Sequence, residues 1–162
     1  GVISDTHMPY RAKRLPQVLM SGLAGVDLIL HAGDWVSLET AEMLQKIAPL
    51  DGVAGNNDGA EIERRFGRKK LLHVQGFRIG IVHGDGASLT TPERAMAAFA
   101  EERPDVIIFG HSHQPYHRVH DGILLFNPGS PTDKRLEPRY SYGILELGSK
   151  LTAYHHFFDD KS

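Results

Sequence analysis

The sequence contains no cysteine, and this absence removes several classes of function from consideration. Without thiols the chain forms no disulfide, holds no metal through sulfur and has no cysteine nucleophile. Any metal must therefore be bound through nitrogen and oxygen. The chain has 162 residues, which is close to the size of one domain, so residues 1–162 are predicted to form a single domain around one core.

Long apolar runs and a strong charge of one sign are also missing. No apolar run approaches the roughly 20 residues that span a bilayer, and no basic segment followed by an apolar stretch opens the chain. A formal net charge of -2 gives no general attraction to nucleic acid or to anionic membranes. We therefore expect a cytoplasmic protein with no membrane partner and no long nucleic acid as partner. Because the chain begins at Gly1 and enters an apolar triplet at once, a few upstream strand residues are expected to be missing.

Three common catalytic motifs are absent as well. The sequence has no G-x-x-x-x-G-K-S/T loop to cradle a nucleotide, no G-x-S-x-G turn for a serine nucleophile and no H-E-x-x-H zinc motif.

What the chain does contain is a recurring unit in which an apolar run ends in polar residues. There are five such runs: GVISDTH at 1–7, VDLILHAGD at 26–34, GVAGNND at 52–58, FRIGIVHGD at 77–85 and DVIIFGHSH at 105–113. Short runs rich in β-branched residues, without clean alternation, are typical of strands that are buried on both faces. Helical patterns near 15–23 and 38–47 separate the first three runs, and a third helix is predicted near 92–102 with Thr91 as its cap. The chain therefore opens as β-α-β-α-β.

Hairpins dominate the second half of the sequence. Strand pairs are predicted around Gln75-Gly76, around Asp121-Gly122 and around the turn at 148–150. We assign the last pair, including the aromatic segment at 154–158, to the second sheet. The predicted fold is α/β: a four-layer α/β/β/α sandwich of two mixed β-sheets with flanking helices.

The polar ends of the five runs supply seven residues that can bind a metal: Asp5, His7, Asp34, Asn56, His83, His111 and His113. The interval from Asp5 to Asp34 matches one βαβ unit, which would place both carboxylates at the same edge of neighbouring parallel strands. In extended backbone, residues two apart point the same way. Asp5 with His7, and His111 with His113, are therefore each predicted to direct two ligands to one point.

A structural role has to be weighed against the metal site. One histidine at the end of a strand is more often structural than functional, because an imidazole can simply satisfy a buried hydrogen bond. Seven polar residues at the ends of five strands are harder to explain in this way, since each would cost a few kcal/mol if buried without a partner. The sequence therefore favours a metal site.

In their order and spacing these residues resemble a known family. The motifs are Asp5-Thr6-His7, Gly33-Asp34, Gly55-Asn56-Asn57-Asp58, His83 and Gly110-His111-Ser112-His113. From Ile3 to about Ser130 the chain resembles the calcineurin-like metallophosphoesterase superfamily, especially its small YfcE-type bacterial and archaeal phosphodiesterases. The resemblance implies a two-sheet α/β sandwich, in agreement with the fold predicted above.

The resemblance also implies a dinuclear centre and a reaction. Asp5, His7 and His113 would hold one metal, Asn56, His83 and His111 the other, and Asp34 would bridge them. A hydroxide held between the metals would attack the phosphorus of a phosphodiester or phosphomonoester in line. Asp34, Asn56 and His83 would act in catalysis by positioning the metals and the phosphate. Nitrogen and oxygen ligands suit manganese, iron, nickel, cobalt or zinc, and manganese is expected first because it is common in the resembling enzymes.

One residue departs from the family pattern. Asn57 stands where superfamily members with a G-N-H-D/E motif carry the histidine that protonates the leaving group. An amide cannot donate a proton at neutral pH, although many YfcE-type members lack this histidine too. The proton would come from water or another side chain. Asp58 is a weak candidate, and we expect it rather to orient Asn56.

For the other polar residues we expect roles in the core, in supporting the site or in contact with solvent. His31 is expected in the core or behind the ligands, and Asp85 is equally compatible with a place near the pocket and with solvent. The basic cluster of Arg64, Arg65, Arg68, Lys69 and Lys70 is expected to be a solvated face rather than a phosphate contact. The loop Asn127-Pro128-Gly129-Ser130 resembles one that shapes the site in the family.

Function is thus predicted as metal-dependent hydrolysis of a small phosphate ester, with a homo-oligomer as a further expectation. The alternative is a protein-interaction scaffold without catalysis, because the retromer subunit of vacuolar sorting keeps this fold but has lost some metal ligands. Here all seven ligand positions are filled, which favours the enzyme. A regulatory metal sensor is a third alternative that the sequence does not separate from an enzyme.

Overall fold

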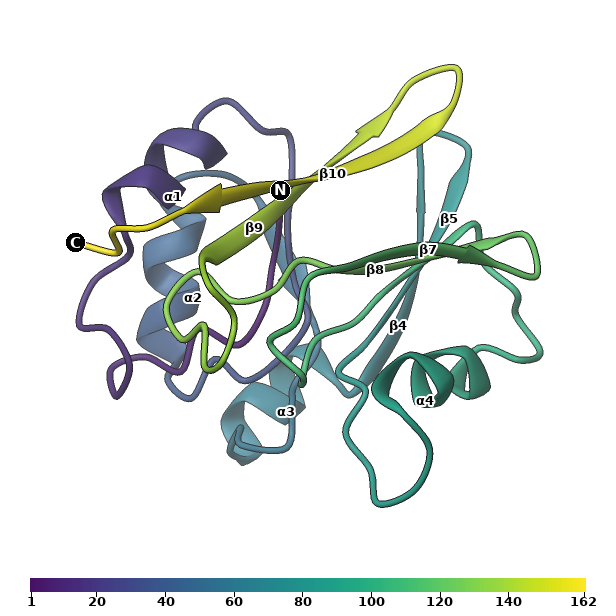
Figure 1. The fold of residues 1–162 in the computed structure, drawn as a ribbon, viewed down its shortest axis with the longest axis horizontal. Coiled ribbons are helices and arrows are strands. Elements are labelled where there is room, and N and C mark those ends of the chain that lie inside the picture. Colours follow the sequence, from purple (N-terminus) through teal and green to yellow (C-terminus); the bar gives the residue numbers. More distant parts are fainter.

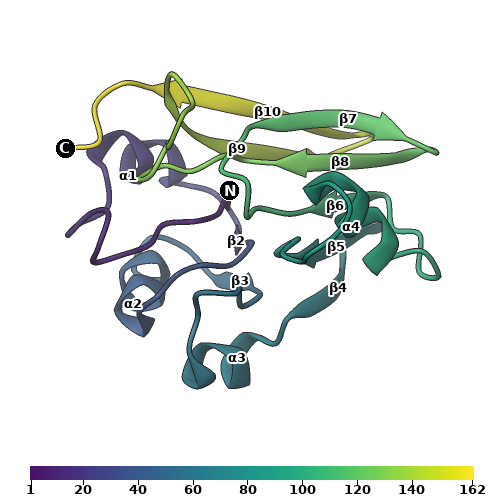
Figure 2. The same ribbon diagram turned by 60° about the horizontal axis from the view of Figure 1, so that its bottom comes forward.

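A computed structural model describes all 162 residues of the chain. Two five-stranded sheets face each other, and helices lie on the outer side of each sheet (Figures 1 and 2). Both sheets contain parallel and antiparallel pairs. The predicted four-layer α/β/β/α sandwich of two mixed sheets is therefore confirmed.

The first sheet has the strand order β10-β9-β1-β2-β3. Its strands are β1 (Val2–Ile3), β2 (Ile29–His31), β3 (Leu50–Gly52), β9 (Tyr140–Leu147) and β10 (Leu151–Phe158). β1, β2 and β3 are parallel, and α1 (Gln17–Leu23) and α2 (Leu38–Gln45) connect them. This is the predicted β-α-β-α-β opening. The carboxyl ends of the three strands therefore lie along one edge of the sheet.

The second sheet has the strand order β4-β5-β6-β8-β7. Its strands are β4 (Lys69–Val74), β5 (Phe77–Val82), β6 (Val106–Ile108), β7 (Tyr116–His120) and β8 (Ile123–Asn127). β5, β6 and β8 are parallel, and hairpins add β4 and β7 as antiparallel edges. The hairpins turn at the predicted residues, where φ is 52° at Gln75, 82° at Gly76, 51° at Asp121 and 78° at Gly122. Two consecutive positive φ angles are the mark of the type I′ hairpin turn.

Alternation along the strands builds the layers. Val2 and Leu30 lie in the core between the sheets, whereas their neighbours Ile3 and Ile29 pack under the helices of the first sheet. The same alternation in the second sheet directs Ile107 outward to α4 (Thr91–Ala98). Figures 1 and 2 show α1, α2 and α3 (Ala60–Phe66) beside the first sheet and α4 beside the second.

The last hairpin corrects the predicted topology. β9 and β10 were assigned to the second sheet, but β9 pairs with β1 at Val2 and Gly143, so both strands belong to the first sheet. Antiparallel alternation fits the edge of either sheet, and the sequence pattern did not distinguish them. Tyr142 and Phe158 of this hairpin pack into the core under α1 and α2.

Two further corrections concern helices. Helix α3 was not predicted, although Ile62 and Phe66, four residues apart, are its buried residues. Its cap is Gly59, which provides no side-chain capping signal. The cap of α4 is Thr90 rather than Thr91: its hydroxyl accepts from the Glu93 N–H, and the Glu93 carboxylate accepts from the Thr90 N–H. This reciprocal pair is a capping box.

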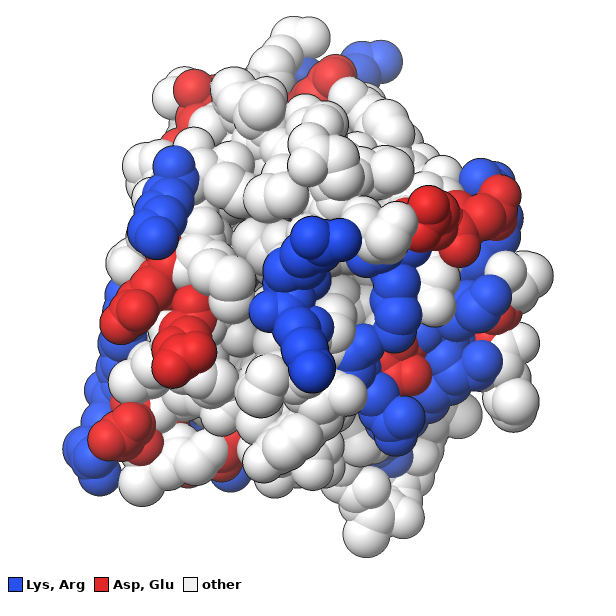
Figure 3. All heavy atoms as spheres, turned by 90° about the vertical axis from the view of Figure 1, so that its left-hand side faces the viewer, with Lys and Arg blue, Asp and Glu red and all other residues white.

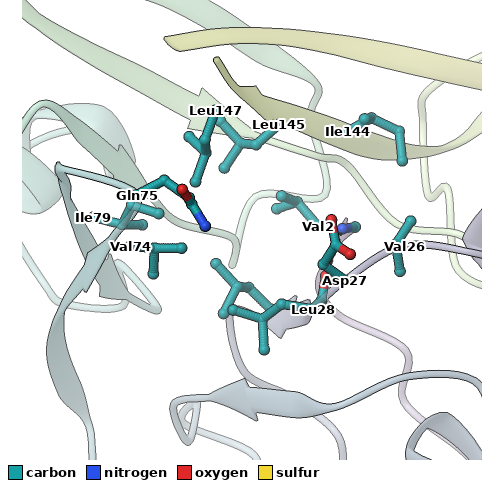
Figure 4. A pocket seen from close by; sticks show the side chains of 12 residues that line it. Val2, Val26, Asp27, Leu28, Val74, Gln75, Ile79, Ile144, Leu145 and Leu147 are labelled. Atoms are coloured by element: carbon teal, nitrogen blue, oxygen red, sulfur yellow. Dashed lines mark hydrogen bonds between the residues drawn. The ribbon is translucent and has the colours of Figure 1, made fainter. Parts of the chain in front are cut away.

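The sandwich is not filled at the end where the parallel strands begin. A cavity of about 450 Å³ lies there, lined mainly by aliphatic side chains of both sheets, among them Val2, Leu28, Val74, Leu145 and Leu147 (Figure 4). The ligand residues follow the other ends of the same strands. The cavity and the ligand residues thus lie at opposite ends of these strands.

Charges on the surface are mixed. The face that includes the C-terminal end, on the left of Figure 1, carries gathered Lys and Arg side chains with carboxylates between them (Figure 3). Ion pairs Arg11–Asp133 and Arg139–Asp159 join neighbouring loops of the chain. In the whole chain, no helix has both the length and the apolar composition to cross a membrane.

Candidate metal centre

All seven predicted ligands lie in loops just beyond the carboxyl ends of strands. Asp5 and His7 follow β1, Asp34 follows β2, Asn56 follows β3, His83 follows β5, and His111 and His113 follow β6. Three of these strands belong to the first sheet and two to the second. The loops of both sheets therefore meet over one edge of the sandwich.

The backbone of these loops is not extended. This corrects the expectation that ligands two residues apart converge because extended backbone points them the same way. φ is 57° at Asp5, 44° at His7, 62° at Asp34, 69° at His111 and 62° at His113. Non-glycine residues rarely adopt positive φ, and the strain persists only where the surroundings enforce it. The ligands converge because tight left-handed turns aim their side chains, not because alternate residues of a strand share a face.

The first cluster consists of Asp5, His7 and His113, whose ligand atoms lie within 4.8 Å of one another. Asp5 Oδ1 lies 3.5 Å from His113 Nε2 and 3.8 Å from His7 Nε2. His113 donates its Nδ1–H to the carbonyl oxygen of Asp133 over 2.5 Å. That bond leaves the lone pair of Nε2 directed at Asp5, and a neutral imidazole in this tautomer is a metal ligand.

The second cluster consists of Asp5, Asp34 and His83. His83 Nε2 lies 3.2 Å from Asp34 Oδ2, and His7 Nε2 lies 3.5 Å from the same oxygen. His83 donates its Nδ1–H to the carbonyl oxygen of Ala32 over 2.7 Å, so Nε2 again faces the cluster. Asp34 Oδ2 thus lies between a histidine of each cluster.

Asn56 and His111 lie on the open side of the second cluster. His111 Nδ1 is 3.2 Å from Asn56 Oδ1, and the His111 ring meets the His83 ring edge-on with centroids 5.2 Å apart. His113 lies in the other cluster. The prediction that His111 and His113 point at one place is therefore wrong: with left-handed backbone at both residues, their side chains enter different clusters.

Unpaired polar atoms show that a cation fits here. Asp5 Oδ1 and the Nε2 atoms of His7, His83 and His113 are buried and have no hydrogen-bond partner. Each such atom costs about 1–3 kcal/mol when it is left unsatisfied. These four atoms all face the same small volume, and hard or borderline donors of this kind are ligands of divalent transition metals. A divalent ion is the partner that they lack.

Burial and neighbouring groups favour, for most of the ligands, the ionisation states that a metal requires. Burial raises the pKa of Asp34, but the adjacent His83 imidazole and the hydrogen bonds from Asn57 outweigh it and hold that pKa well below the usual range. Burial lowers the pKa of His113 and of His111. His83 differs: burial lowers its pKa, while Asp34 and Asp5 together raise it to about 9. At neutral pH a cation therefore displaces a proton from His83.

Asn57 takes a defined place beside Asp34. Its backbone N–H donates to Asp34 Oδ1 and its Nδ2–H donates to Asp34 Oδ2, both over 2.9 Å. Two donors from one residue fix the plane of this carboxylate. The asparagine that replaces the family's histidine thus contacts the central carboxylate, but it supplies no proton to a leaving group.

Asp58 ties two ligand loops together through backbone N–H groups. Its Oδ2 accepts from Asp34 and from Gly55, each over 2.8 Å, and its Oδ1 accepts from Val36 over 2.7 Å. Val36 is a β-branched residue with φ of 76°, a strained conformation that this bond helps to hold. The expectation that Asp58 orients its surroundings rather than binds metal agrees with these contacts, although it acts on the backbone and not on the Asn56 side chain.

The loop after β8 supports the first cluster from below. Ser130 Oγ donates to the carbonyl oxygen of Asp5 over 2.8 Å, and Thr132 Oγ1 donates to that of Thr6 over 2.7 Å. Asn127 Nδ2 donates to the carbonyl oxygen of Gly110 over 3.0 Å. The loop at 127–132, whose first four residues resemble a loop of the family, therefore holds the segments 5–7 and 110–113 in place.

Gly55 and Gly110 were named in the sequence only as members of motifs, and the structure shows their physical role. A Cβ at Gly55 would collide with Asp34 Oδ1 and lie 2.9 Å from His83 Nε2. A Cβ at Gly110 would lie 2.6 Å from Asp5 Oδ2. The glycines that precede Asn56 and His111 therefore let the backbone approach the carboxylates. Their position directly before a ligand was the sequence signal for this close approach of the backbone.

Three of the five residues of the basic cluster are engaged in ion pairs. Arg68 pairs with Glu63 and reaches Asp85, Lys69 pairs with Glu102, and Lys70 pairs with Asp51. Asp85 is thus engaged with Arg68. The interpretation of this cluster as a solvated face agrees with the pairs.

His31 is the residue behind the ligands that the sequence suggested. It is fully buried, accepts from the Gly33 N–H at Nδ1 over 3.1 Å and donates Nε2–H to Thr6 Oγ1 over 3.0 Å. Its ring stacks on Trp35 with centroids 3.8 Å apart. A neutral His31 thus joins the loop of Asp5 and His7 to the loop of Asp34.

A pH dependence of stability follows from His31. Burial lowers its pKa to about 3, below the ordinary value of 6.5, so its neutral form stabilises the fold above pH 6.5 and that contribution is lost as pH falls toward 3. Between pH 7 and pH 5 this loss is about 2 kcal/mol. Urea unfolding of metal-stripped protein at the two pH values measures it. His31→Asn, which keeps an acceptor for Gly33, should be less stable at pH 7 but lose less on acidification; an equal loss in both proteins would contradict the assignment.

Comparisons with known proteins agree with the geometry. Residues 1–150 match the calcineurin-like phosphoesterase superfamily domain. A probable metallophosphoesterase of Methanothermobacter thermautotrophicus is 39% identical over 158 residues, which is 94% of this chain and 88% of that protein. A phosphodiesterase of Methanocaldococcus jannaschii is 26% identical over 145 residues, covering 80% of this chain and 81% of its own.

Solved structures show the same fold. Vps29 of Entamoeba histolytica, crystallised in complex with zinc, superposes with a TM-score of 0.83 at 27% identity. The match covers 99% of this chain and 93% of that one. The sandwich and its edge of converging loops are therefore shared with proteins of known structure.

Proposed function

This chain belongs to the calcineurin-like phosphoesterase superfamily and is a metal-dependent phosphoesterase, and we propose that it hydrolyses phosphodiesters at a centre of two divalent ions. The observation that carries the proposal is the set of four buried, unpaired ligand atoms around Asp5 and Asp34. A phosphodiesterase among its relatives supports the diester as substrate.

The geometry suggests how the ligands divide between the ions. Asp5, His7 and His113 would hold one ion and Asn56, His83 and His111 the other. Asp34 would be shared, because its Oδ2 lies 3.5 Å from His7 Nε2 and 3.2 Å from His83 Nε2. This division agrees with the one that the resemblance implied. Manganese is our first choice of metal, with iron, nickel, cobalt and zinc as the alternatives that the same donors accept.

The residues around the metal centre have different roles in the proposed reaction. Bound divalent ions would supply an activated water as nucleophile and positive charge for the transition state. Asn56 is exposed and His111 is half-buried, so substrate reaches the centre from their side. Asp34, Asn56 and His83 position the ions and the phosphate.

No side chain beside the centre is placed as a general acid. Asn57 is an amide, and both oxygens of Asp58 already accept backbone N–H bonds. The leaving group would take its proton from water. Diesters with good leaving groups, such as nitrophenolate, should therefore react much faster than alkyl diesters.

The scaffold alternative is supported by the structural likeness to Vps29. Against it stand the seven filled ligand positions and the relatives named as metallophosphoesterases. The small phosphate-ester substrate, the cytoplasmic location, a homo-oligomer and the absence of a long nucleic acid partner stay predictions.

Hydrolysis of bis-p-nitrophenyl phosphate by metal-stripped protein tests the proposal. We expect turnover only after a divalent metal is added, with manganese among the effective ions. The same addition should raise the free energy of unfolding by about 2.7 kcal/mol at a hundredfold excess over Kd. If metals stabilise the protein but none supports turnover, the scaffold is favoured. If no metal gives either stabilisation or turnover, the metal centre itself is refuted.

A further inference from the structure

A lysine beyond the last strand joins two loops that hold the first cluster. Lys161 lies three residues after the end of β10, and its side chain is half-buried. Its Nζ donates to the carbonyl oxygen of Arg11 over 2.7 Å and to that of Thr132 over 3.0 Å. The first carbonyl belongs to the loop after β1 and the second to the loop after β8. One ammonium group therefore bridges two loops that are far apart in sequence.

The carbonyl on the β1 side belongs to the turn that carries His7. The Arg11 N–H donates to the carbonyl oxygen of His7 over 2.8 Å, which closes one turn of backbone directly after this ligand. Lys161 binds the same residue from the other side, at its carbonyl oxygen. It therefore limits the movement of the turn and, through the turn, of His7.

The carbonyl on the β8 side belongs to the loop that orients His113. The residue after Thr132 is Asp133, whose carbonyl oxygen accepts the Nδ1–H of His113 over 2.5 Å. This bond sets the orientation of the ring and leaves Nε2 facing the first cluster. A shift of the backbone at 132–133 would move the acceptor and turn the ring, which is how groups behind a metal ligand affect binding.

Many lysines on protein surfaces bind carbonyl oxygens without acting on a distant site, and Lys134 shows what such a residue looks like here. Its Nζ lies 5.1 Å from the centroid of the Tyr140 ring, and the Nζ of Lys161 lies 5.6 Å from the same centroid. Lys134 donates to the carbonyl oxygen of Pro138, within its own loop, over 3.4 Å. Lys161 differs because it joins two loops, each of which leads to a ligand of the same cluster.

We propose that Lys161 is a positioning residue of the metal centre, whose two bonds hold His7 and His113 in the arrangement that binds one ion. This inference rests on the proposed metal centre and adds to it a residue outside the seven ligands. The sign of the effect is distinctive. The positive charge of Lys161 repels a divalent ion, so its removal would strengthen metal binding if charge were its only contribution. Positioning predicts weaker binding, because fewer metal-free molecules then have both ligands in place.

Calorimetric titration of metal-stripped protein with manganese tests this sign. Lys161→Met keeps most of the side-chain length and loses both donors, and we expect the Kd for manganese to rise about tenfold. Lys161→Arg can still donate to both carbonyls and should restore the Kd to within about twofold of the wild type. The kcat of Lys161→Met for bis-p-nitrophenyl phosphate at saturating manganese should stay within about twofold, since bound metal selects the ordered loops.

Lys134→Met is the matched control, because it removes the same charge beside the same aromatic ring without separating two loops. Its manganese affinity should equal or exceed that of the wild type. An unchanged or stronger affinity in Lys161→Met would overturn the inference. An equal weakening in both methionine variants would overturn it as well.

A second readout needs no metal. The Nδ1–H groups of His113 and His83 are both bonded to backbone carbonyls, those of Asp133 and Ala32. In metal-free Lys161→Met, NMR should show faster exchange with water for the Nδ1–H of His113 and unchanged exchange for that of His83. Unchanged exchange at both histidines would contradict the positioning role. If the wild-type protein binds no manganese, the proposed metal centre fails, and the exchange measurement still decides whether Lys161 orients His113.

Discussion

Asp34→Asn is expected to lower kcat/KM for bis-p-nitrophenyl phosphate about a thousandfold at saturating manganese. Asp34 Oδ2 is the atom nearest to histidines of both clusters, 3.2 Å from His83 Nε2 and 3.5 Å from His7 Nε2. An amide has the same shape but no charge and only one oxygen. It cannot hold two ions, and losing about 4 kcal/mol of transition-state stabilisation corresponds to three factors of ten.

The fold should survive this exchange, because the amide oxygen can still accept from Asn57. Circular dichroism and the melting temperature of the metal-free protein check that point. Asp159→Asn is the matched control, since Asp159 is an exposed carboxylate that pairs only with Arg139. It should keep full activity. Unchanged turnover in Asp34→Asn would show that this carboxylate does not hold the metals.

The convergence of the ligands that follow parallel strands was predictable because the polarity of those strands follows from the sequence. Apolar runs separated by helices give parallel strands, and parallel strands end at one edge. The spacing of Asp5 and Asp34 therefore places them together without knowledge of side-chain geometry. Once the strands are assigned, the position of the site follows.

The details of the site were not predictable in this way. Left-handed conformations at Asp5, Asp34 and His111 depend on bonds between loops that are far apart in sequence, such as the Asp5 N–H to the Gly33 carbonyl over 2.9 Å. Tautomers of His83 and His113 are set by backbone carbonyls of Ala32 and Asp133. A carbonyl is present in every residue, so no sequence pattern marks it.

Short or ambiguous elements account for the errors in the fold. Helix α3 has seven residues and a glycine cap, which leaves only the Ile62 and Phe66 spacing as a signal. The β9–β10 hairpin alternates in a way that suits either sheet, and only its pairing with β1 decides. Local patterns predict the type of an element better than its partner.

Asp58→Ala is expected to have the second largest effect, on stability and on metal binding together. It removes the acceptors for the N–H groups of Asp34, Val36 and Gly55. Each lost bond to a charged group costs about 1.5–3 kcal/mol when its donor stays partly buried, so three lost bonds at the lower end of that range reduce the free energy of unfolding by about 4.5 kcal/mol. Manganese affinity should fall about 10–100-fold, as it does when groups that orient ligands are removed.

Asp58→Asn separates this positioning role from general acid catalysis. Burial raises the pKa of Asp58, but both of its oxygens accept backbone N–H bonds, so the carboxylate acts as an acceptor and not as a proton donor. The amide keeps the acceptor for Asp34 and Gly55 and loses only the bond to Val36. Its activity should fall by the same factor for nitrophenyl and for phenyl diesters, with an unchanged pH profile. If Asp58 were a general acid, its removal would reduce the activity most for the diester with the poorer leaving group. A much larger loss of activity with the phenyl diester would therefore assign proton donation to Asp58.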